Sequence, residues 1–566
     1  MSLSIQQALT KAFGNNKNIR VLHVQEYAAG DALVPLSEEA NASSRRASHG
    51  VTLVKLFLRT TGPAPDLPLP DAGTDIGMEI WLPEPGFWNN RIRCQIQGAF
   101  MGDFRVASPR HFSIPICTDL LSGEIASELG YVVSTTDGGH SVEDMEDFSY
   151  LMNADGSINS EGWKNLAYES AHVLGITTKE LTEAYYGQPA AYSYLYGCSS
   201  GGRAAYHSAQ QYPDDFDGLL IGAPSLTQSL MFPSLLHPII VIQNELGGEP
   251  FKENQLEIVS QRALAAGDTT VNGQHDGYLT DWESNSYDPT QDLEILDTSS
   301  GGTCTEPWAL SLAQAKAINK IWYGPTLDGE IPEPSDDNGS SCPRSKNQLF
   351  WGKIRGTRIE YTTIARGAAT GLLALALQDS SLASPNWNHP TGVGRDNWRT
   401  WSYAQYASAL VKCQSMNSHF ANMDADEPQL LKRAQANGTK ILTYHGLADP
   451  ITNPQNSINY YRTSAEHTGG LAKTREFHRL FLIPGMGHCF RMAGCAGAAK
   501  PPIPTLEELF TALVTWTEEN KAPDSLIAQS VDGTITRPIG MFLGRPMGPK
   551  YLGGDIHAAS SYEVAC

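Results

Sequence analysis

The sequence predicts an α/β fold with a mostly parallel central sheet. Short apolar segments typical of strands recur along the chain, and from residue 163 onward they alternate with segments in which apolar residues recur at helical spacing. Such alternation makes neighbouring strands parallel and covers both faces of the sheet with helices. The chain has 566 residues, of which 41% are hydrophobic and 18% charged, so it can bury a large core.

The N-terminal part of the chain contains strand-like segments that either alternate between apolar and polar residues or run continuously apolar. They are residues 51–59, 78–83, 91–97 and 130–137. Proline- and glycine-rich sequence separates them, which is typical of turns. In residues 163–186, apolar side chains recur at helical spacing with one interruption near Gly175, and we expect a helix there.

The alternation of strands and helices continues on both sides of a long interruption. We expect strands at 191–196, 218–222, 440–444 and 479–484. We expect helices at 201–212, 454–465 and 505–519. The last of these helices carries Leu506, Leu509, Phe510 and Leu513 on one face, which would cover the sheet.

Between the two stretches of regular alternation the sequence is rich in turns and contains isolated helical pieces. The simplest explanation is a domain inserted into the sheet. We therefore predict a catalytic domain built from residues 1–225 and 422–566, and an inserted lid domain at 226–421. A lid in this place would lie above the ligand crevice at the ends of the strands.

The charge and the apolar segments exclude two classes of partner. Lys and Arg number 40 against 61 Asp and Glu, a formal charge of −21, which would repel nucleic acid and anionic membrane surfaces. No apolar run reaches the length of a transmembrane helix. The N-terminus lacks the features of a signal peptide, so we expect either an intracellular protein or a secreted one whose leader is absent from this sequence.

A candidate nucleophile lies between a predicted strand and a predicted helix. The segment 196–203 contains Gly197-x-Ser199-x-Gly201, which fits the nucleophile elbow, a sharp turn that presents a serine hydroxyl at the edge of the sheet. The glycines are needed because a β-carbon would collide with the turning backbone. Ser200 is the competing nucleophile, but it lacks a glycine two positions before it. The alternative is a surface turn.

A serine needs a base and a group that orients the base, and in this fold they follow in the order Ser, Asp or Glu, His. His488 follows the predicted strand 479–484 on a glycine-rich loop, and Asp449 follows the strand 440–444. We predict the triad Ser199, Asp449 and His488. The alternative for Asp449 is a simple Asx-turn before proline. For His445 we expect only a hydrogen bond within its loop.

Two cysteines adjoin the predicted triad. Cys198 directly precedes Ser199, and Cys489 directly follows His488. If the serine and the histidine are within hydrogen-bond reach, the two sulfur atoms must lie close together and could form a disulfide. The alternative is two unrelated buried thiols.

The order Cys-Ser, Asp, His-Cys resembles the CS-D-HC arrangement of the tannase and feruloyl esterase family. The resemblance extends to other segments: 81–90, 130–140, 212–224, 444–450 and 484–489. It implies an α/β-hydrolase fold with a large inserted lid domain, and a serine carboxylic ester hydrolase that forms an acyl-enzyme. It also implies an oxyanion hole made by the backbone N–H of Ser200 and a donor at Gly98 or Ala99, although the family usually has two adjacent glycines there.

The resemblance further implies a possible structural Ca²⁺ in the lid and no organic cofactor. The matching loop, 267–278, offers the following expected ligands: Asp268, Asn272, Gln274, Asp276 and Tyr278. Asn272 stands where the family tends to have a carboxylate, which would weaken binding. For the remaining cysteines the candidate pairs are Cys304 with Cys342 and Cys495 with Cys566, and we expect free thiols at Cys94, Cys117 and Cys413.

The family's substrates imply a small-molecule partner, an aromatic ester of a phenolic acid such as a galloyl or feruloyl ester. Tryptophans of the lid segment could wall a flat acyl group, although most of them are expected in the lid's own core. Two alternatives stay open: an esterase or lactonase acting on an intracellular aromatic specialised metabolite, and a non-catalytic binding relative. We expect a monomer or homodimer.

Overall fold

The computed structural model describes residues 3–33, 45–67, 69–98, 102, 104–106, 120–141, 147–252, 254–268, 275–359, 366–489, 493–546 and 548–564. It divides into two compact units, which we call unit 1 (Met1–Ile221 and Asn417–Ile441) and unit 2 (Gly222–Met416 and Leu442–Cys566). We describe each unit by itself. The predicted division into a catalytic domain and a lid domain stays a prediction.

Unit 1 is built around a mixed sheet. Across the sheet its strands are β1 (Ile19–Tyr27), β2 (Val51–Arg59), β3 (Asp75–Pro83), β5 (Val132–Thr136), β4 (Arg91–Ile96), β6 (Tyr192–Cys198) and β7 (Gly218–Gly222). Antiparallel pairing joins β1, β2, β3 and β5, whereas β4 pairs in parallel with both β5 and β6. The predicted strands are thus present, and 51–59 and 218–222 have the predicted bounds.

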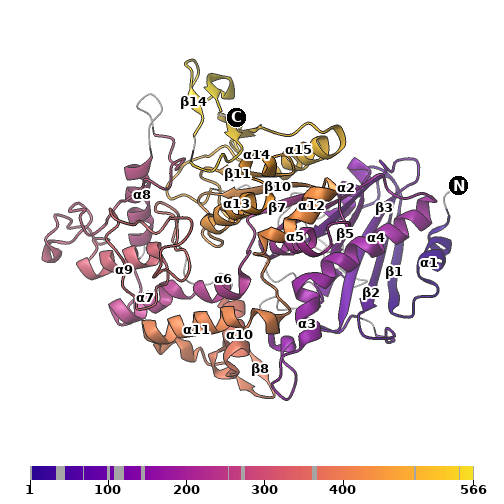
Figure 1. Cartoon of the computed structure of the whole chain (residues 1–566), viewed down its shortest axis with the longest axis horizontal. Coiled ribbons are helices and arrows are strands. Elements are labelled where there is room, and N and C mark those ends of the chain that lie inside the picture. Colours follow the sequence, from indigo (N-terminus) through magenta and orange to yellow (C-terminus); the bar gives the residue numbers. More distant parts are fainter. Residues whose placement is uncertain are drawn as a thin grey trace. The chain divides into compact units, whose positions relative to one another are not determined.

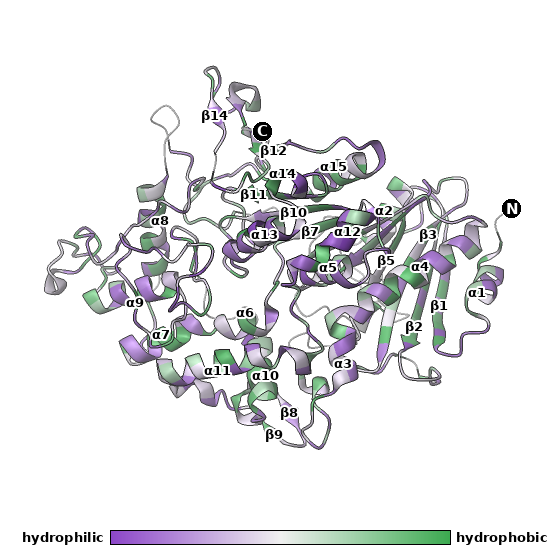
Figure 2. Ribbon diagram, in the orientation of Figure 1, coloured by the Kyte–Doolittle hydropathy of each residue, from purple (hydrophilic) through white to green (hydrophobic). Residues whose placement is uncertain are grey.

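The helices of unit 1 include α1 (Ile5–Phe13), α2 (Ser122–Leu129), α3 (Ser160–Lys164), α4 (Ser170–Tyr186), α5 (Ser200–Gln211) and α12 (Leu431–Asn437). Helices α2, α4 and α5 pack against the sheet, whereas α1 packs on α4 and α12 packs on α5. A π-helical turn at Asn165–Glu169 joins α3 to α4, so the predicted helix 163–186 exists but is interrupted ten residues before Gly175. Helix α4 contacts β4 and β5, and α5 contacts β6 (Figure 1). Figure 2 shows hydrophobic residues along the strands and a mixed, amphipathic pattern on α4.

A buried ion pair explains a charged residue in the otherwise apolar strand β2. Lys55 lies opposite Glu79 of β3, and its Nζ lies 2.8 Å from the Glu79 carboxylate, with both side chains 1% exposed. The Lys55 ammonium also donates to the carbonyl of Arg105, and Trp81 Nε1 donates to Glu79. Because each buried charge has partners, the strand can be buried without leaving an unpaired charge in the core.

Unit 2 contains the end of the sheet and a large helical part. Its sheet strands are β10 (Lys440–Gly446), whose first residues belong to unit 1, and the adjacent β11 (His478–Ile483). Its longer helices are α6 (Gln228–Ser234), α7 (His237–Leu246), α8 (Gln255–Gly267), α9 (Leu312–Tyr323), α10 (Arg366–Leu377), α11 (Tyr403–Ser415), α13 (Pro454–Thr468) and α15 (Leu506–Glu519). A hairpin of β12 (Ser525–Gln529) and β13 (Thr536–Gly540) follows α15.

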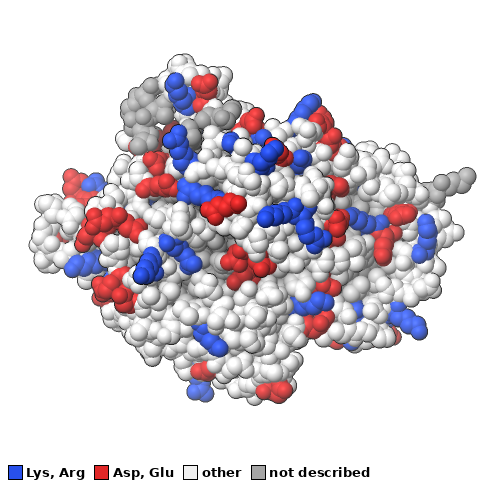
Figure 3. All heavy atoms as spheres, in the orientation of Figure 1, with Lys and Arg blue, Asp and Glu red and all other residues white. Residues whose placement is uncertain are grey.

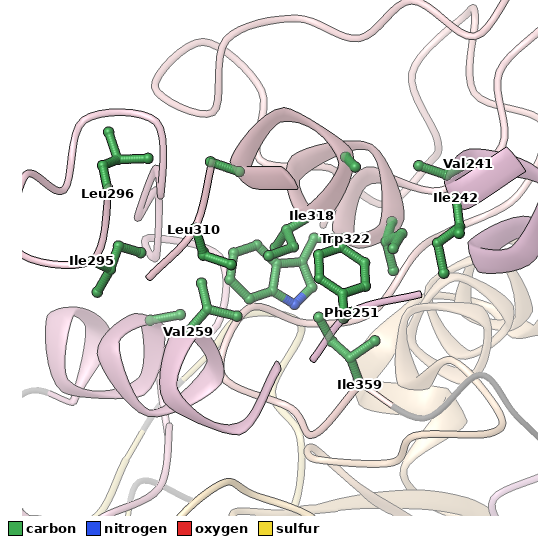
Figure 4. Packing of buried hydrophobic residues seen from close by; sticks show 14 residues of the cluster. Val241, Ile242, Phe251, Val259, Ile295, Leu296, Leu310, Ile318, Trp322 and Ile359 are labelled. Atoms are coloured by element: carbon green, nitrogen blue, oxygen red, sulfur yellow. The ribbon is translucent and has the colours of Figure 1, made fainter. Parts of the chain in front are cut away.

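The segment between α7 and residue 359 has its own hydrophobic core. Trp322 of α9 is 1% exposed and lies at the centre of this cluster, with Ile318, Leu310 and Phe251 around the indole ring (Figure 4). Trp322 is one of the tryptophans expected to build the lid's own core. Removing such a buried ring costs about 3–5 kcal/mol.

Acidic and basic side chains are interspersed on the face of the molecule drawn in Figure 3. Within the described ranges, no helix combines the length and the apolar character needed to cross a membrane.

Candidate active site

The switch in strand order of unit 1 lies at β4, whose neighbours are β5 on one side and β6 on the other. In register, Ile96 of β4 pairs with both Thr136 of β5 and Gly197 of β6, so the carboxyl ends of these strands lie level at one edge. Ligands of open α/β sheets bind at such an edge, beside the switch. The residues that follow Ile96 and Gly197 are therefore placed for chemistry.

Ser199 occupies a tight, strained turn between β6 and α5. Its backbone has φ 61° and ψ −122°, a conformation rare for a residue with a side chain, and it is 6% exposed. A β-carbon at Gly197 would lie 2.2 Å from the carbonyl oxygen of Gly201, and one at Gly201 would lie 2.4 Å from that of Ile96. Both glycines are thus required by close backbone contacts, and the predicted elbow is present.

Ser200 begins helix α5, and its side chain is not equivalent to that of Ser199. The Ser200 hydroxyl is buried and has no hydrogen-bond partner within the described ranges. Its backbone N–H belongs to the first turn of α5, where amide groups have no partner within the helix and can bind an anion. Gly98 follows β4 and is buried at the same edge, whereas Ala99 lies outside the described residues.

Arg203 connects the elbow helix to the π-helical turn, a role that the sequence did not reveal. Its guanidinium is buried and donates to the carbonyls of Ala167 at 2.7 Å and Leu166 at 2.9 Å. Burial lowers the pKa of Arg203 to about 10, and the charge of Asp424 opposes that shift. Arg203 thereby fixes the start of α5 against the wider turn that precedes α4.

In unit 2, Asp449 follows β10 and is 2% exposed. Its Oδ1 accepts the backbone N–H groups of Ile451 (2.7 Å) and Thr452 (2.9 Å), the Asx-turn considered as the alternative reading. Its Oδ2 accepts the Thr452 hydroxyl at 2.7 Å and His488 Nδ1–H at 2.6 Å. Oδ1 thus makes the Asx-turn while Oδ2 faces His488, so the turn does not exclude the role predicted for Asp449.

These partners keep Asp449 ionised. Burial by itself raises the pKa of the carboxyl group, but the interaction with His488 and the hydrogen bonds from His445 and His488 outweigh it and hold the pKa far below its ordinary range. An ionised carboxylate only accepts hydrogen bonds, so the proton between the two groups sits on His488 Nδ1. His488 Nε2 is then an acceptor, as a general base requires.

His445 lies closer to this pair than we expected. It makes the expected loop contact, with Nε2 at 3.3 Å from the Thr452 carbonyl oxygen, but the same Nε2 is also 3.3 Å from Asp449 Oδ2. Its Nδ1 lies 2.8 Å from the Ser457 hydroxyl, and the ring is fully buried. His445 and Thr452 are thus two neighbours of the Asp449 carboxylate that the sequence analysis did not assign; their spacing of four and three residues from Asp449 was the available signal.

The described cysteines fall into two groups, disulfide-bonded and free. Cys198 and Cys489 are disulfide-bonded, as expected of each, and Cys489 Sγ lies 3.5 Å from His488 Nε2. Cys304, Cys342 and Cys495 are free thiols, so the pairs Cys304–Cys342 and Cys495–Cys566 were wrong. Cys94 and Cys413 are buried and free, as expected, while Cys117 and Cys566 lie outside the described residues. Burial raises the pKa of Cys342 and Cys413 to about 12, so both are protonated.

The loop proposed to hold calcium is partly described. The carboxylate of Asp276 lies 3.2 Å from Arg537, and that of Asp268 accepts the Gly277 N–H at 2.8 Å. The guanidinium already neutralises Asp276, so these two carboxylates do not fit a calcium site. Tyr278 is buried beside them, and Asn272 and Gln274 lie outside the described residues. Within the described ranges, no group of three or more His, Cys, Asp or Glu side chains could hold a metal ion.

Comparisons with known proteins bear on this arrangement. The model of the tannase and feruloyl esterase family matches residues 67–565. A probable feruloyl esterase of Arthroderma benhamiae is 30% identical over 492 residues, covering 86% of this chain and 82% of the relative.

Two solved structures are similar over nearly the whole chain. An esterase from Aspergillus oryzae has a TM-score of 0.71 at 21% identity, covering 99% of both chains. A tannin acyl hydrolase from Aspergillus niger has a TM-score of 0.69 at 18% identity, covering 97% of this chain and 93% of the other. At these identities the likeness speaks for the fold, and it confirms the predicted α/β class. From the family match and the Arthroderma relative, the chain belongs to the tannase and feruloyl esterase family and is a carboxylic ester hydrolase.

Proposed function

We propose that the chain hydrolyses esters of phenolic acids, such as galloyl or feruloyl esters, with Ser199, His488 and Asp449 as its catalytic triad. The observation that carries the proposal is the His488–Asp449 pair at 2.6 Å, which leaves Nε2 of the histidine as the base. The strained elbow at Ser199 supplies the matching nucleophile. Each of the two catalytic loops carries a disulfide-bonded cysteine beside its catalytic residue.

In this mechanism His488 Nε2 takes the proton of the Ser199 hydroxyl as its oxygen attacks the ester carbonyl carbon. The protonated imidazole is stabilised by Asp449 and then gives its proton to the departing alcohol. An acyl-enzyme is left on Ser199. Water, deprotonated by the same histidine, attacks the acyl carbon and releases the carboxylic acid with the serine restored.

The negative charge on the tetrahedral oxygen needs preorganised donors. We propose the backbone N–H of Ser200 as one of them, and a backbone N–H at Gly98 or Ala99 as the other. The register of β4 with β6 supports this choice, because it places Gly98 and Ser199 after paired residues at one sheet edge. Each such donor contributes roughly 3–4 kcal/mol to the transition state.

The aromatic acyl group is proposed from the relatives, whose names include a feruloyl esterase and a tannin acyl hydrolase. The partner is accordingly a small ester, with no role for nucleic acid or membrane, and we propose a monomeric or homodimeric chain that light scattering would identify. No calcium is assigned a role, because the described residues of its expected loop do not fit one.

The test is hydrolysis of a matched panel by wild type and Ser199→Ala. The panel contains methyl gallate, methyl ferulate, methyl caffeate and a short p-nitrophenyl alkanoate. The proposal expects a phenolic ester to be preferred and its turnover to fall at least 10³-fold in the variant. Undiminished turnover in Ser199→Ala would refute the nucleophile. Activity on the alkanoate alone would refute the phenolic acyl group and favour an aromatic specialised metabolite outside the panel.

A further inference from the structure

Unit 2 contains a cavity whose lining includes neither Asp449 nor His488. Its volume is about 340 Å³, and its walls come from the segment after α8, the ends of β10 and β11, and the chain around and beyond β13. Four aromatic side chains line it: Tyr278, Trp282, Phe542 and Tyr562. The volume lies in the range of sites for small molecules, at its lower end.

The aromatic walls are held rigidly. Trp282 and Phe542 belong to one buried cluster, with ring centroids 6.4 Å apart. The Arg537 guanidinium lies 4.4 Å from the Tyr562 ring and is ion-paired with Asp276. Because these rings are packed against the core, the cavity is formed before any ligand arrives, so binding needs little ordering of the walls.

The cavity also has polar groups with open hydrogen-bonding capacity. The Arg545 side chain is exposed and makes no ion pair or hydrogen bond among the described residues. Asp281 accepts one long bond, from the Ser284 N–H at 3.3 Å, so most of its acceptor capacity is open. A ligand in the cavity can therefore find one donor and one acceptor that the protein itself leaves unused.

The charges of the lining nearly cancel. Arg537 is paired with Asp276, which leaves Arg545 opposed by Asp268 and Asp281 among the lining residues. The two carboxylates would repel an anion, and the guanidinium would repel a cation. A neutral ligand that both donates and accepts hydrogen bonds avoids both costs.

We propose that this cavity binds a neutral ring compound carrying several hydroxyl groups. The ring would pack on the aromatic walls, and its hydroxyl groups would bond Asp281 and Arg545. Sugars and polyphenols share this chemistry. The site goes beyond ester hydrolysis and does not depend on the proposed triad.

The test is calorimetric titration of the full chain with two neutral probes, methyl β-glucoside and pyrogallol, and with benzoate and benzylamine as charged controls. Asp281→Asn and Arg545→Gln alter side chains that are not deeply buried and spare the core. Arg433→Gln, an exposed arginine of unit 1, is the matched control.

We expect at least one neutral probe to bind more tightly than both charged controls. Its Kd should rise about fivefold or more in the two cavity variants and stay unchanged in Arg433→Gln, with turnover of the p-nitrophenyl ester within about twofold of wild type throughout. Which probe binds distinguishes a sugar from a polyphenol. Absence of binding up to about 20 mM, or an affinity equal in all variants, would overturn the proposal, whatever the ester panel shows.

Discussion

Replacing Asp449 by Asn tests the acid of the proposed triad at atomic detail. Asparagine keeps an oxygen for the two backbone N–H groups that bind Oδ1, but it places an amide NH₂ where Oδ2 now accepts. That oxygen faces Thr452 Oγ1 at 2.7 Å, His488 Nδ1 at 2.6 Å and His445 Nε2 at 3.3 Å. Facing a donor, His488 would carry its proton on Nε2 and could no longer act as the base.

These contacts allow estimates of the fall in kcat and of the loss of unfolding free energy in Asp449→Asn. Loss of the correct histidine tautomer in a triad lowers kcat by about 10⁴-fold, by analogy with a serine protease. The hydroxyl of Thr452 can rotate and His445 can keep its other partner, so one or two buried donors lose their acceptor. At about 1–3 kcal/mol each, the variant should lose about 1–6 kcal/mol of unfolding free energy.

The pH dependence has a definite sign. The pKa of Asp449 is lower in the folded state than in the unfolded state, where it is about 4. The ionised carboxylate therefore stabilises the fold above about pH 4, and this stabilisation is lost as the pH falls from there toward the folded-state pKa. Wild type should therefore lose stability below about pH 4, and Asp449→Asn should show a flatter acid profile.

The assays are kcat and KM on the preferred ester, and thermal unfolding across the pH range. Asp75→Asn is the matched control, since Asp75 is a fully buried carboxylate of unit 1 bound by Arg59 at 2.6 Å. It should lose comparable stability and keep its kcat within about threefold. A kcat for Asp449→Asn within tenfold of wild type would refute the assignment of the acid.

Other predictions concern the neighbouring residues and loops. His445→Gln should lower kcat about tenfold with little change in KM and shift the acid limb of the pH–rate profile, because it removes a donor to the triad acid; an unshifted profile would leave His445 a purely structural residue. Mass spectrometry of unreduced peptides should find Cys198 joined to Cys489, and alkylation of both as free thiols would contradict this pairing. EDTA should leave the unfolding temperature unchanged, since the described carboxylates of loop 268–278 do not fit a calcium site, whereas a drop of several degrees would show a bound metal.

The sequence predicted the buried strands well because their burial leaves a continuous apolar signal. Strands 51–59 and 218–222 have the predicted bounds. Strand β1 (Ile19–Tyr27) was missed: it lies at the end of the sheet, is mostly half-exposed, and its pairing with β2 is irregular between Val21 and His23. A bulge shifts the side-chain alternation by one residue, which removes the period of two that identifies a strand.

In the candidate site, local sequence sufficed where one turn fixes the geometry. The elbow could be predicted because the two glycines around Ser199 are required by close backbone contacts, either within a few residues or with the adjacent strand. The loop of Asp276 could not, because its partner Arg537 lies 261 residues further along the chain. No motif near Asp276 indicates that its partner is a guanidinium from the β12–β13 hairpin near the C-terminus.

The two cysteines that flank the proposed nucleophile and the proposed base have a specific role if they pair with each other. A disulfide between Cys198 and Cys489 would close a loop of about 290 residues, which in the chain-entropy model stabilises the fold by about 5–6 kcal/mol. A disulfide at many other pairs of positions would stabilise the fold to a similar extent. A bond directly beside both Ser199 and His488 would also limit how far the proposed nucleophile and base can move apart, and such alignment is where much of the rate of an enzyme comes from. Reduction should therefore lower kcat at temperatures well below unfolding, before any loss of folded protein.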